Sequence, residues 1–331
     1  MSHEAAASFD PSLVALSVRV EELASKVALV ARATSTGFAD EVTRLIAAAR
    51  ARSPTAPRFR YRPGDDLDDL ARGLDAVLAA IGPSQSGFVG AIVGRAREAR
   101  FEVDIARAIG TPELPLLARR RFRASPTDDA RATRWARLSS SDDGEPRVTS
   151  DDESEPRSLV NVMGRALGAL KLPVRVVIRP DLAALAATGD GVVQIAGGRL
   201  HTERQALRIT VHEIEGHVLP RLRRIAAGAT MRLAGDGDLE EGFALLAEQK
   251  AGLLDRERRA ELGRRHVAAK LAHEGADFWQ IVDALEDLGE RPDNAVRMAS
   301  RATRGGGLGR ERVYVPAYFR AKEGSLSLGF L

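Results

Sequence analysis

The sequence of 331 residues contains no cysteine. This absence excludes disulfide bonds and thiolate metal sites, so any bound metal must be held by imidazole nitrogens and oxygen atoms. No apolar run approaches the roughly 18 residues that a membrane-spanning helix requires, and the N-terminus lacks the basic and then apolar layout of a secretion signal. We therefore expect no membrane contact and a cytoplasmic location.

The chain has little excess charge of either sign, since its formal net charge is only +3. The charged residues are unevenly distributed along it. Residues 138–158 contain seven acidic residues and two arginines, which leaves a mildly basic remainder that favours acidic partners. The segment is rich in Ser, Asp, Glu and Pro, so we expect a disordered linker or loop. A sharper alternative is that it occupies a basic cleft as a mimic of an acidic substrate tail.

The acidic segment divides the chain into a helical N-terminal region, 1–137, and a second domain, 159–331. Apolar residues at three- and four-residue intervals predict helices over 11–33, 37–52, 67–81 and 86–109. A basic patch at 117–123 has a single Phe and no recognised nucleic-acid-binding motif, so we expect no nucleic-acid partner.

After the acidic segment, the pattern predicts a helix over 159–170 and short strands over 174–178 and 192–195. Thr202 and Gln205 form a capping box that starts a further helix, whose buried face we expect to carry Leu207, Val211 and Ile214.

This last helix contains the sequence HEIEGH at residues 212–217. Two imidazoles and a carboxylate are a common ligand set for catalytic zinc, and a glutamate beside the first histidine is where a zinc hydrolase keeps its general base. His212 and His217 are the candidate ligands, and Glu213 is the candidate base. The alternative is that the two histidines are unrelated.

The spacing of the two histidines makes a specific structural prediction. They are five positions apart, and at roughly 100° per residue an undistorted helix would separate their rings by about 140°. The helix must therefore contain a π-type bulge or unwind before His217. Gly216, which tolerates unusual backbone angles, lies where such a bulge is needed.

A second motif, EEGFA at residues 240–244, begins an apolar helical run that can return a carboxylate to the first helix. This segment favours metal binding over two unrelated histidines. Glu215 lies on the opposite side of the first helix from Glu213, so it becomes a ligand only if the bulge rotates the helix.

Residues 212–219 resemble the HExxxH motif of a zinc carboxypeptidase family that includes the microtubule-associated tyrosine carboxypeptidase and bacterial proteins named for a Gln-Glu-Gly-Leu-Ala motif. EEGFA stands where that second motif belongs. Further matches are PRFRY at 57–61, IRPDL at 178–182, RGGGL at 304–308 and VYV at 313–315. The chain departs from the family at Glu215-Gly216, usually Gly-Thr, and at 309–311, usually Thr-Lys-Asp.

The resemblance implies roles for individual residues. His212, His217 and Glu241 would bind Zn²⁺, while Glu240, where the family has Gln, would orient a histidine or the substrate from outside the ligand set. Glu213 would act as general base on the attacking water. Two basic residues, Arg304 and Arg310, are candidates to bind a terminal carboxylate, and Tyr314 could donate a hydrogen bond to the developing oxyanion.

We therefore expect an α+β protein, mainly α, in which a zincin-like metallopeptidase core with a small sheet packs against the helical N-terminal region. The expected function is zinc-dependent removal of a C-terminal residue from a protein or peptide tail, acidic in its upstream sequence. The alternatives are an endopeptidase with a narrow protein substrate and a catalytically inactive, zinc-bound binding module.

Overall fold

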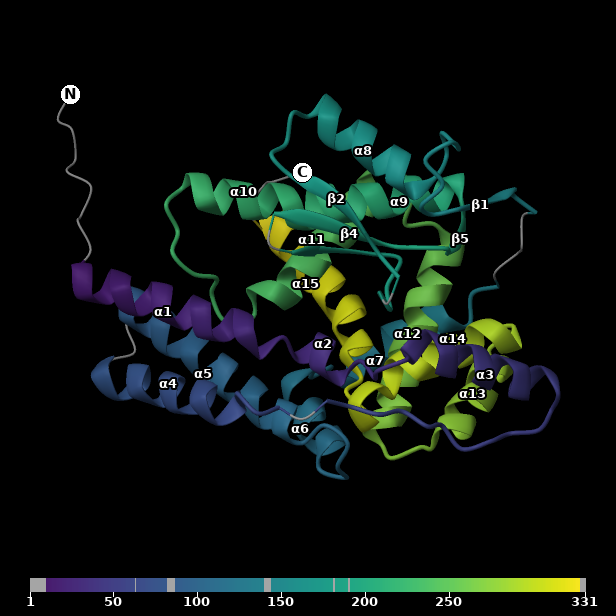
Figure 1. The fold of residues 1–331 in the computed structure, drawn as a ribbon, viewed down its shortest axis with the longest axis horizontal. Coiled ribbons are helices and arrows are strands. Elements are labelled where there is room, and N and C mark those ends of the chain that lie inside the picture. The colour runs from purple at the N-terminus through teal and green to yellow at the C-terminus, as the bar shows by residue number, and fades with distance from the viewer. Residues whose placement is uncertain are drawn as a thin grey trace.

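The computed structural model describes residues 10–62, 64–81, 87–139, 144–180, 182–189 and 191–327, with side chains as far as 324. In these residues the protein is mainly helical with two small sheets, which confirms the expected α+β, mainly α class (Figure 1). None of the helices in the described ranges is long and apolar enough to cross a membrane.

The N-terminal part is helical, as the apolar periodicity predicts. Its helices are α1 (Pro11–Val27), α2 (Leu29–Ala33), α3 (Phe38–Arg50), α4 (Leu67–Ile81), α5 (Gly87–Arg107), α6 (Leu114–Arg121) and α7 (Pro126–Ala136). The helix expected over 11–33 is divided at Ala28, whose φ of 44° is left-handed. Residue 86, the expected start of the fourth helix, lies outside the described residues.

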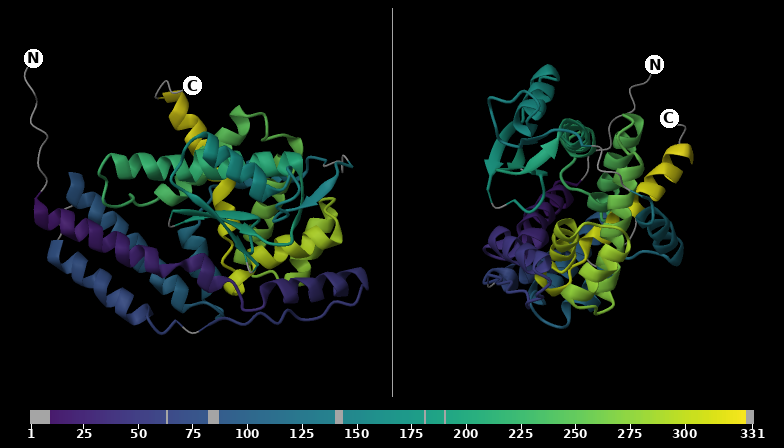
Figure 2. Two further views of the ribbon diagram at one scale, coloured as in Figure 1. Left: turned by 45° about the horizontal axis from the view of Figure 1, so that its top comes forward. Right: turned by 90° about the vertical axis from the view of Figure 1, so that its right-hand side faces the viewer.

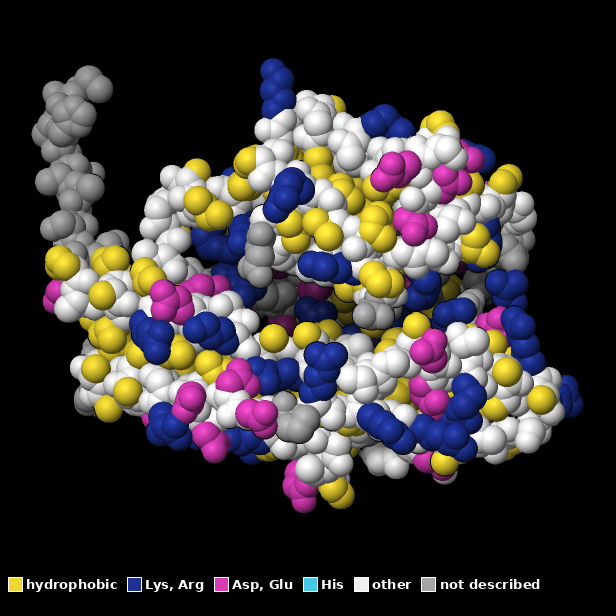
Figure 3. Space-filling model, viewed as in Figure 1, with side chains coloured by type: hydrophobic (Ala, Val, Ile, Leu, Met, Phe, Trp, Pro, Cys, Tyr) yellow, Lys and Arg dark blue, Asp and Glu magenta, His cyan; other side chains and the backbone are white. Residues whose placement is uncertain are grey.

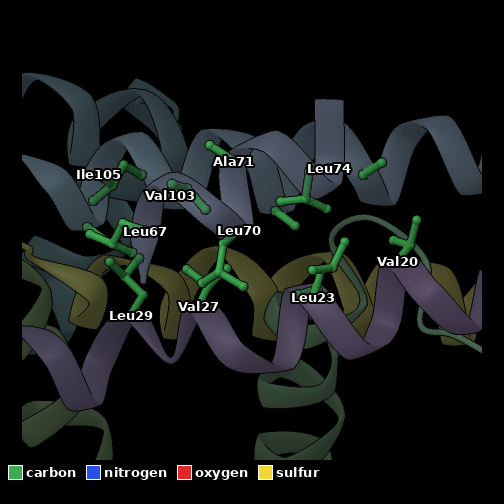
Figure 4. Close-up of a cluster of buried hydrophobic side chains, with 14 of the residues drawn as sticks. Val20, Leu23, Val27, Leu29, Leu67, Leu70, Ala71, Leu74, Val103 and Ile105 are labelled. Atoms are coloured by element: carbon green, nitrogen blue, oxygen red, sulfur yellow. The ribbon is translucent and has the colours of Figure 1, made fainter. Parts of the chain in front are cut away.

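Helices α1, α4 and α5 form one apolar core. Leucines and valines of α1 interleave with those of α4, and Ile105 of α5 closes the cluster at one end (Figure 4). These side chains are nearly all removed from water. Burial of each Leu, Ile or Val among them stabilises the fold by about 1.5–3 kcal/mol. The N-terminal helices therefore have a core that does not depend on the sheet.

The sheets lie in the middle of the chain and consist of β1 (Arg147–Thr149), β2 (Arg175–Arg179), β3 (Ala186–Gly189), β4 (Val192–Ala196) and β5 (Leu200–Thr202). The three-stranded sheet has the order β2-β4-β3, with β2 parallel and β3 antiparallel to β4. Strands β1 and β5 pair separately as an antiparallel ribbon. The strands expected over 174–178 and 192–195 are both present, each within one residue of its expected bounds.

The acidic segment differs from the disordered linker that its composition predicts. Residues 140–143 lie outside the described residues, but 147–149 form β1 and residues 150–158 form turns. Backbone pairing with β5 supplies the order that apolar burial does not. The Asp151 carboxylate accepts a hydrogen bond from the Gly198 backbone N–H at 3.0 Å, and Asn161 donates to the Glu153 carbonyl at 2.9 Å. The domain division at this segment remains a prediction.

The remaining helices follow the sheets or lie between their strands. They are α8 (Leu159–Ala169), α9 (Glu203–Glu213), the π-helix Ile214–Val218, α10 (Leu219–Ala226), α11 (Asp236–Lys250), α12 (Arg256–His273), α13 (Phe278–Asp287), α14 (Pro292–Ala302), the 3₁₀ turns Arg304–Gly306 and Arg310–Val313, and α15 (Tyr314–Ser327). Helices α8 and α9 share one apolar cluster with the three-stranded sheet. In the right-hand view of Figure 2 the sheets and α8 lie on one side of the molecule, and α15, in yellow, extends on the other side.

Helix α9 begins as the sequence predicts, because both hydrogen bonds of the Thr202–Gln205 capping box are present. The expected buried face is wrong at Leu207, which is 45% exposed. The buried positions of α9 are Ala206, Thr210 and Glu213, so its inward face is partly polar. Apolar periodicity cannot identify a buried face that includes polar residues such as Thr210 and Glu213.

The π-helix Ile214–Val218 confirms the bulge predicted from the five-residue histidine spacing. The reason expected for Gly216 is wrong, since it does not have a positive φ. A Cβ at Gly216 would lie 2.2 Å from the Cβ of Ala244 on α11. Glycine is required here because two helix backbones approach closely, rather than for its backbone freedom.

This contact generates a stability prediction. Gly216→Ala should lower the free energy of unfolding by about 1–3 kcal/mol, because overpacking must separate the π-helix from α11. Thermal and urea denaturation measure the change. Gly164→Ala is the control, because Gly164 is a helical, exposed residue with open space at its Cβ, and it should stabilise by about 0.5–1 kcal/mol.

A second substitution tests the cause. Adding Ala244→Gly to Gly216→Ala removes the methyl group that the new Cβ meets, so it should recover part of the lost stability. Equal stabilisation by Gly216→Ala and Gly164→Ala would contradict the close-approach account.

Candidate metal centre

The π-helix brings His212 and His217 to the same face of the continuous helical segment, where their ring centroids are 5.3 Å apart. Helix α11 places Glu241 against both rings. Its Oε2 lies 3.4 Å from Nε2 of His212 and 3.7 Å from Nε2 of His217. Ligand atoms of these three residues all lie within 4.8 Å of one another. The structure therefore assembles the three metal ligands predicted from the sequence into one cluster.

The two oxygens of Glu241 have different surroundings. Oε1 accepts a hydrogen bond from Nη2 of Arg310 at 2.9 Å. Oε2 is buried and has no hydrogen-bond partner among the residues that the structure describes, and a buried oxygen in that state is costly unless something binds it. Because Oε2 is the atom that faces the two imidazoles, this donor set fits a divalent metal ion such as zinc.

A buried carboxylate fixes the orientation of the first imidazole. Nδ1 of His212 lies 2.8 Å from Oε1 of Glu248, and a carboxylate only accepts, so Nδ1 carries a proton and the neutral form of the ring has its lone pair on Nε2. Glu248 is fully buried and is gripped by Nε and Nη2 of Arg258 at 3.0 and 3.1 Å. This arrangement points the lone pair of Nε2 towards Glu241.

The second imidazole has a looser support. Nδ1 of His217 lies 3.8 Å from Oε2 of Glu240, whose other oxygen accepts a hydrogen bond from Arg224 at 2.9 Å. Glu240 thus lies behind a histidine, the position expected for a residue outside the ligand set.

Electrostatics within the cluster favour positive charge at the imidazoles. Burial disfavours the protonated form of His212, but its interactions with Glu241 and Glu248 outweigh burial and raise the pKa of His212 to about 10. Burial opposes the charged form of Glu241 too, yet Arg310 and His212 hold the pKa of Glu241 well below its ordinary value. A divalent cation would supply the positive charge that these carboxylates attract, in place of protons.

The candidate base, Glu213, is buried at the end of α9, and its charge acts on both His212 and His217. Its Oε2 accepts a hydrogen bond from the Thr188 hydroxyl of the edge strand β3 at 2.7 Å. Thr188 also lines a largely apolar pocket with Val192 and Val218. Glu213 therefore contacts a residue of that pocket and also acts on both histidines.

The structure separates the two arginines expected to bind a carboxylate. Arg310 contacts Glu241, and its Nη1 lies 3.4 Å from the Tyr314 hydroxyl, so both belong to the surroundings of the cluster. Arg304 is buried and pairs with Glu311 at 2.5 Å. Glu215 is exposed and is outside the cluster. The roles of these residues in binding and catalysis remain predictions.

Three residues that support the cluster are not predicted by the sequence motifs: Glu248, Arg258 and Thr188. One signal could have found Glu248, which lies seven residues after Glu241 on the same helix, two turns along one face. No comparable periodicity connects Thr188 or Arg258 to the motif, because they come from other elements.

The space-filling view shows a hollow between the part that carries the sheets and the N-terminal helices (Figure 3). Lys and Arg side chains gather along it. This distribution agrees with the mildly basic body expected from the sequence.

A family model described as microtubule-associated tyrosine carboxypeptidase matches residues 48–322, which include every residue of the cluster. The chain belongs to this family. Membership confirms the resemblance seen in the motifs and supports a carboxypeptidase acting on a protein tail. No curated protein and no solved structure matches the chain.

The motif shared with this carboxypeptidase family has a packing rationale in the structure. A Cβ at Gly242 would lie 2.2 Å from the carbonyl oxygen of Ala317 on α15, and Ala244 occupies the space beside Gly216. The small residues of EEGFA therefore let α11 approach both neighbours and bring Glu241 to the histidines.

Glu248→Gln tests the support of His212. The amide keeps the shape but loses the charge that holds the His212 Nδ1–H, so zinc affinity should fall by about 10–100-fold. Competition with a chromogenic chelator measures the dissociation constant. Glu240→Gln is the matched control, because Glu240 stands farther from its histidine, and it should weaken binding less. Equal effects of the two substitutions would argue against a special role for Glu248.

Proposed function

We propose that this protein is a zinc-dependent carboxypeptidase that removes a C-terminal residue from a protein or peptide tail. The observation that carries the proposal is the cluster of His212, His217 and Glu241, with one buried glutamate oxygen left without a partner, in a chain of a carboxypeptidase family. The basic hollow favours an acidic tail.

His212 and His217 would hold the zinc ion through Nε2, and Glu241 would hold it through Oε2. Zinc in such a site polarises a peptide carbonyl and lowers the pKa of a coordinated water towards about 7. Glu248 keeps His212 in the tautomer that can bind the ion, and Arg310 keeps Glu241 charged.

Glu213 performs the proton transfers. Its carboxylate takes a proton from the attacking water and passes it to the nitrogen of the leaving residue. The Thr188 hydroxyl holds Oε2, which fixes the carboxylate and leaves Oε1 to accept the proton. Because Thr188 belongs to the edge strand β3, an extended substrate paired with that edge would lie next to Glu213.

The Tyr314 hydroxyl lies beside Arg310, near the Glu241 end of the cluster. From this position it donates a hydrogen bond to the carbonyl oxygen as negative charge develops there. Arg310, already paired with Glu241, acts by fixing the Tyr314 hydroxyl and the ligand together.

Metal content and substrate trimming test the proposal together. Elemental analysis should find about one zinc per chain in the wild type and little in His217→Ala, since two ligands cannot hold the ion tightly. Mass spectrometry of a C-terminal peptide library should show loss of single residues with the wild type only. Zinc without trimming would indicate a binding module, and internal cleavage would indicate an endopeptidase.

Glu213→Gln tests the mechanism. The amide cannot accept a proton, so kcat should fall by about 10²–10⁴-fold while zinc content stays at the wild-type level. Glu215→Gln is the control, because Glu215 is two positions away, exposed and outside the cluster. Its kcat should be unchanged. Wild-type turnover by Glu213→Gln would refute the assigned role.

A further inference from the structure

Three buried or half-buried arginines surround one glutamate beside Tyr314. Arg301 and Arg304 both contact Oε1 of Glu311, at 3.3 and 2.5 Å. The charge of Arg265 also acts on Glu311, and its Cζ lies 4.6 Å from the centre of the Tyr314 ring. Glu261 also lies beside Arg265, so three guanidiniums face two carboxylates and an excess of positive charge remains. Positive charge that is shielded from water calls for an anion.

Arg265 presents a complete binding edge without a partner. Elsewhere in this chain the Nε and Nη2 atoms of an arginine grip both oxygens of a carboxylate, as in Arg258 on Glu248 and Arg44 on Glu41. In Arg265 the same two atoms are buried and have no hydrogen-bond partner within the described part of the chain, and the side chain is only 7% exposed. Its Nη1 is occupied, 3.6 Å from Glu261.

Tyr314 connects this edge to the metal ligands. One face of its ring contacts Arg265, and its hydroxyl lies 3.4 Å from Nη1 of Arg310. Arg310 in turn donates to Glu241 at 2.9 Å. One aromatic side chain and one arginine therefore separate the unpartnered guanidinium edge from a ligand of the proposed zinc ion.

Arg301 marks the side on which the group opens to solvent. Its side chain is 24% exposed, against 2–7% for Glu311, Arg304 and Arg265. Arg297 lies one turn earlier on α14 and is exposed. Burial and the positive charge of Arg297 lower the pKa of Arg199, which belongs to the sheet-bearing part. Among the described residues neither Arg297 nor Arg199 forms an ion pair, so positive charge continues outward from Arg265.

We propose that Arg265, with Arg301 beside it, binds the terminal carboxylate of the substrate. This inference rests on the proposed carboxypeptidase function and replaces the assignment of that role to Arg304 or Arg310. Arg304 and Arg310 each already hold a glutamate oxygen closely, at 2.5 and 2.9 Å, whereas Nε and Nη2 of Arg265 hold none among the described residues. A planar fork that binds both oxygens of a carboxylate also distinguishes a chain end from an internal peptide group.

Binding measurements separate this inference from catalysis. The probe is a fluorescent peptide with acidic residues followed by a C-terminal tyrosine, made as the free acid and as the amide. Both are titrated against zinc-loaded Glu213→Gln protein, so the probe is not consumed. The protein should bind the acid roughly 10–100-fold more tightly than the amide, the range of a charge-assisted hydrogen-bonded pair.

Arg265→Lys should remove most of this preference, because an ammonium cannot supply two parallel N–H groups, while affinity for the amide stays within about twofold. Arg259→Lys is the matched control. Arg259 lies on the same helix, and among the described residues its buried Nε also has no hydrogen-bond partner. Its guanidinium lies over an aromatic ring at 5.9 Å, but that ring belongs to Trp135 and not to Tyr314. It should keep the full acid preference.

Arg301→Gln is a second, more exposed substitution that should reduce the acid preference by a smaller factor, and it serves if Arg265→Lys melts below the assay temperature. Retention of the acid preference in both variants would overturn the inference. Equal binding of acid and amide by the Glu213→Gln protein without a further substitution would overturn it too. Acid preference without any cleavage by the wild type would instead contradict the proposed function and leave the carboxylate site standing.

Discussion

The contact between Gly216 and Ala244 fixes the geometry on which the metal cluster depends. An ordinary helix would separate His212 and His217 by about 140°, and the π-helix reduces that separation by adding one residue to the turn. The widened turn is held against α11, where the absence of a Cβ at Gly216 allows the backbones to approach. Glu241 lies on the same helix three residues before Ala244, so one helix contact sets the bulge and delivers the third ligand.

Charge pairing orients the side chains of the cluster, whose surroundings are largely polar. Three glutamates around the histidines are each held by an arginine: Glu248 by Arg258, Glu241 by Arg310 and Glu240 by Arg224. Buried pairs of this kind add little net stability, since desolvation offsets most of the attraction. Their effect is orientation, because every oxygen engaged by an arginine narrows the positions left for the others. The remaining oxygen, Oε2 of Glu241, faces the imidazoles.

The sequence predicts local features well, but it predicts poorly the contacts between residues that are distant along the chain. The π-helix follows from a spacing, and the Thr202 cap and the helices before residue 110 follow from neighbouring residues. Leu207 was expected inside because apolar periodicity does not recognise a buried face made of Thr210 and Glu213. The pairing of Arg304 with Glu311 and the strand within the acidic segment depend on partners that only the fold supplies.

Tyr314 contacts both parts of the proposed site, the metal cluster through Arg310 and the carboxylate-binding Arg265 directly. Its hydroxyl is tied to Arg310 and hence to Glu241, while its ring supports Arg265. A carboxypeptidase must hold the scissile carbonyl and the terminal carboxylate one residue apart, and small displacements reduce its rate strongly. If Arg265 binds the carboxylate, the spacing between both ends of the terminal residue is set by one rigid ring. The need for a free chain end is then a consequence of packing around Tyr314.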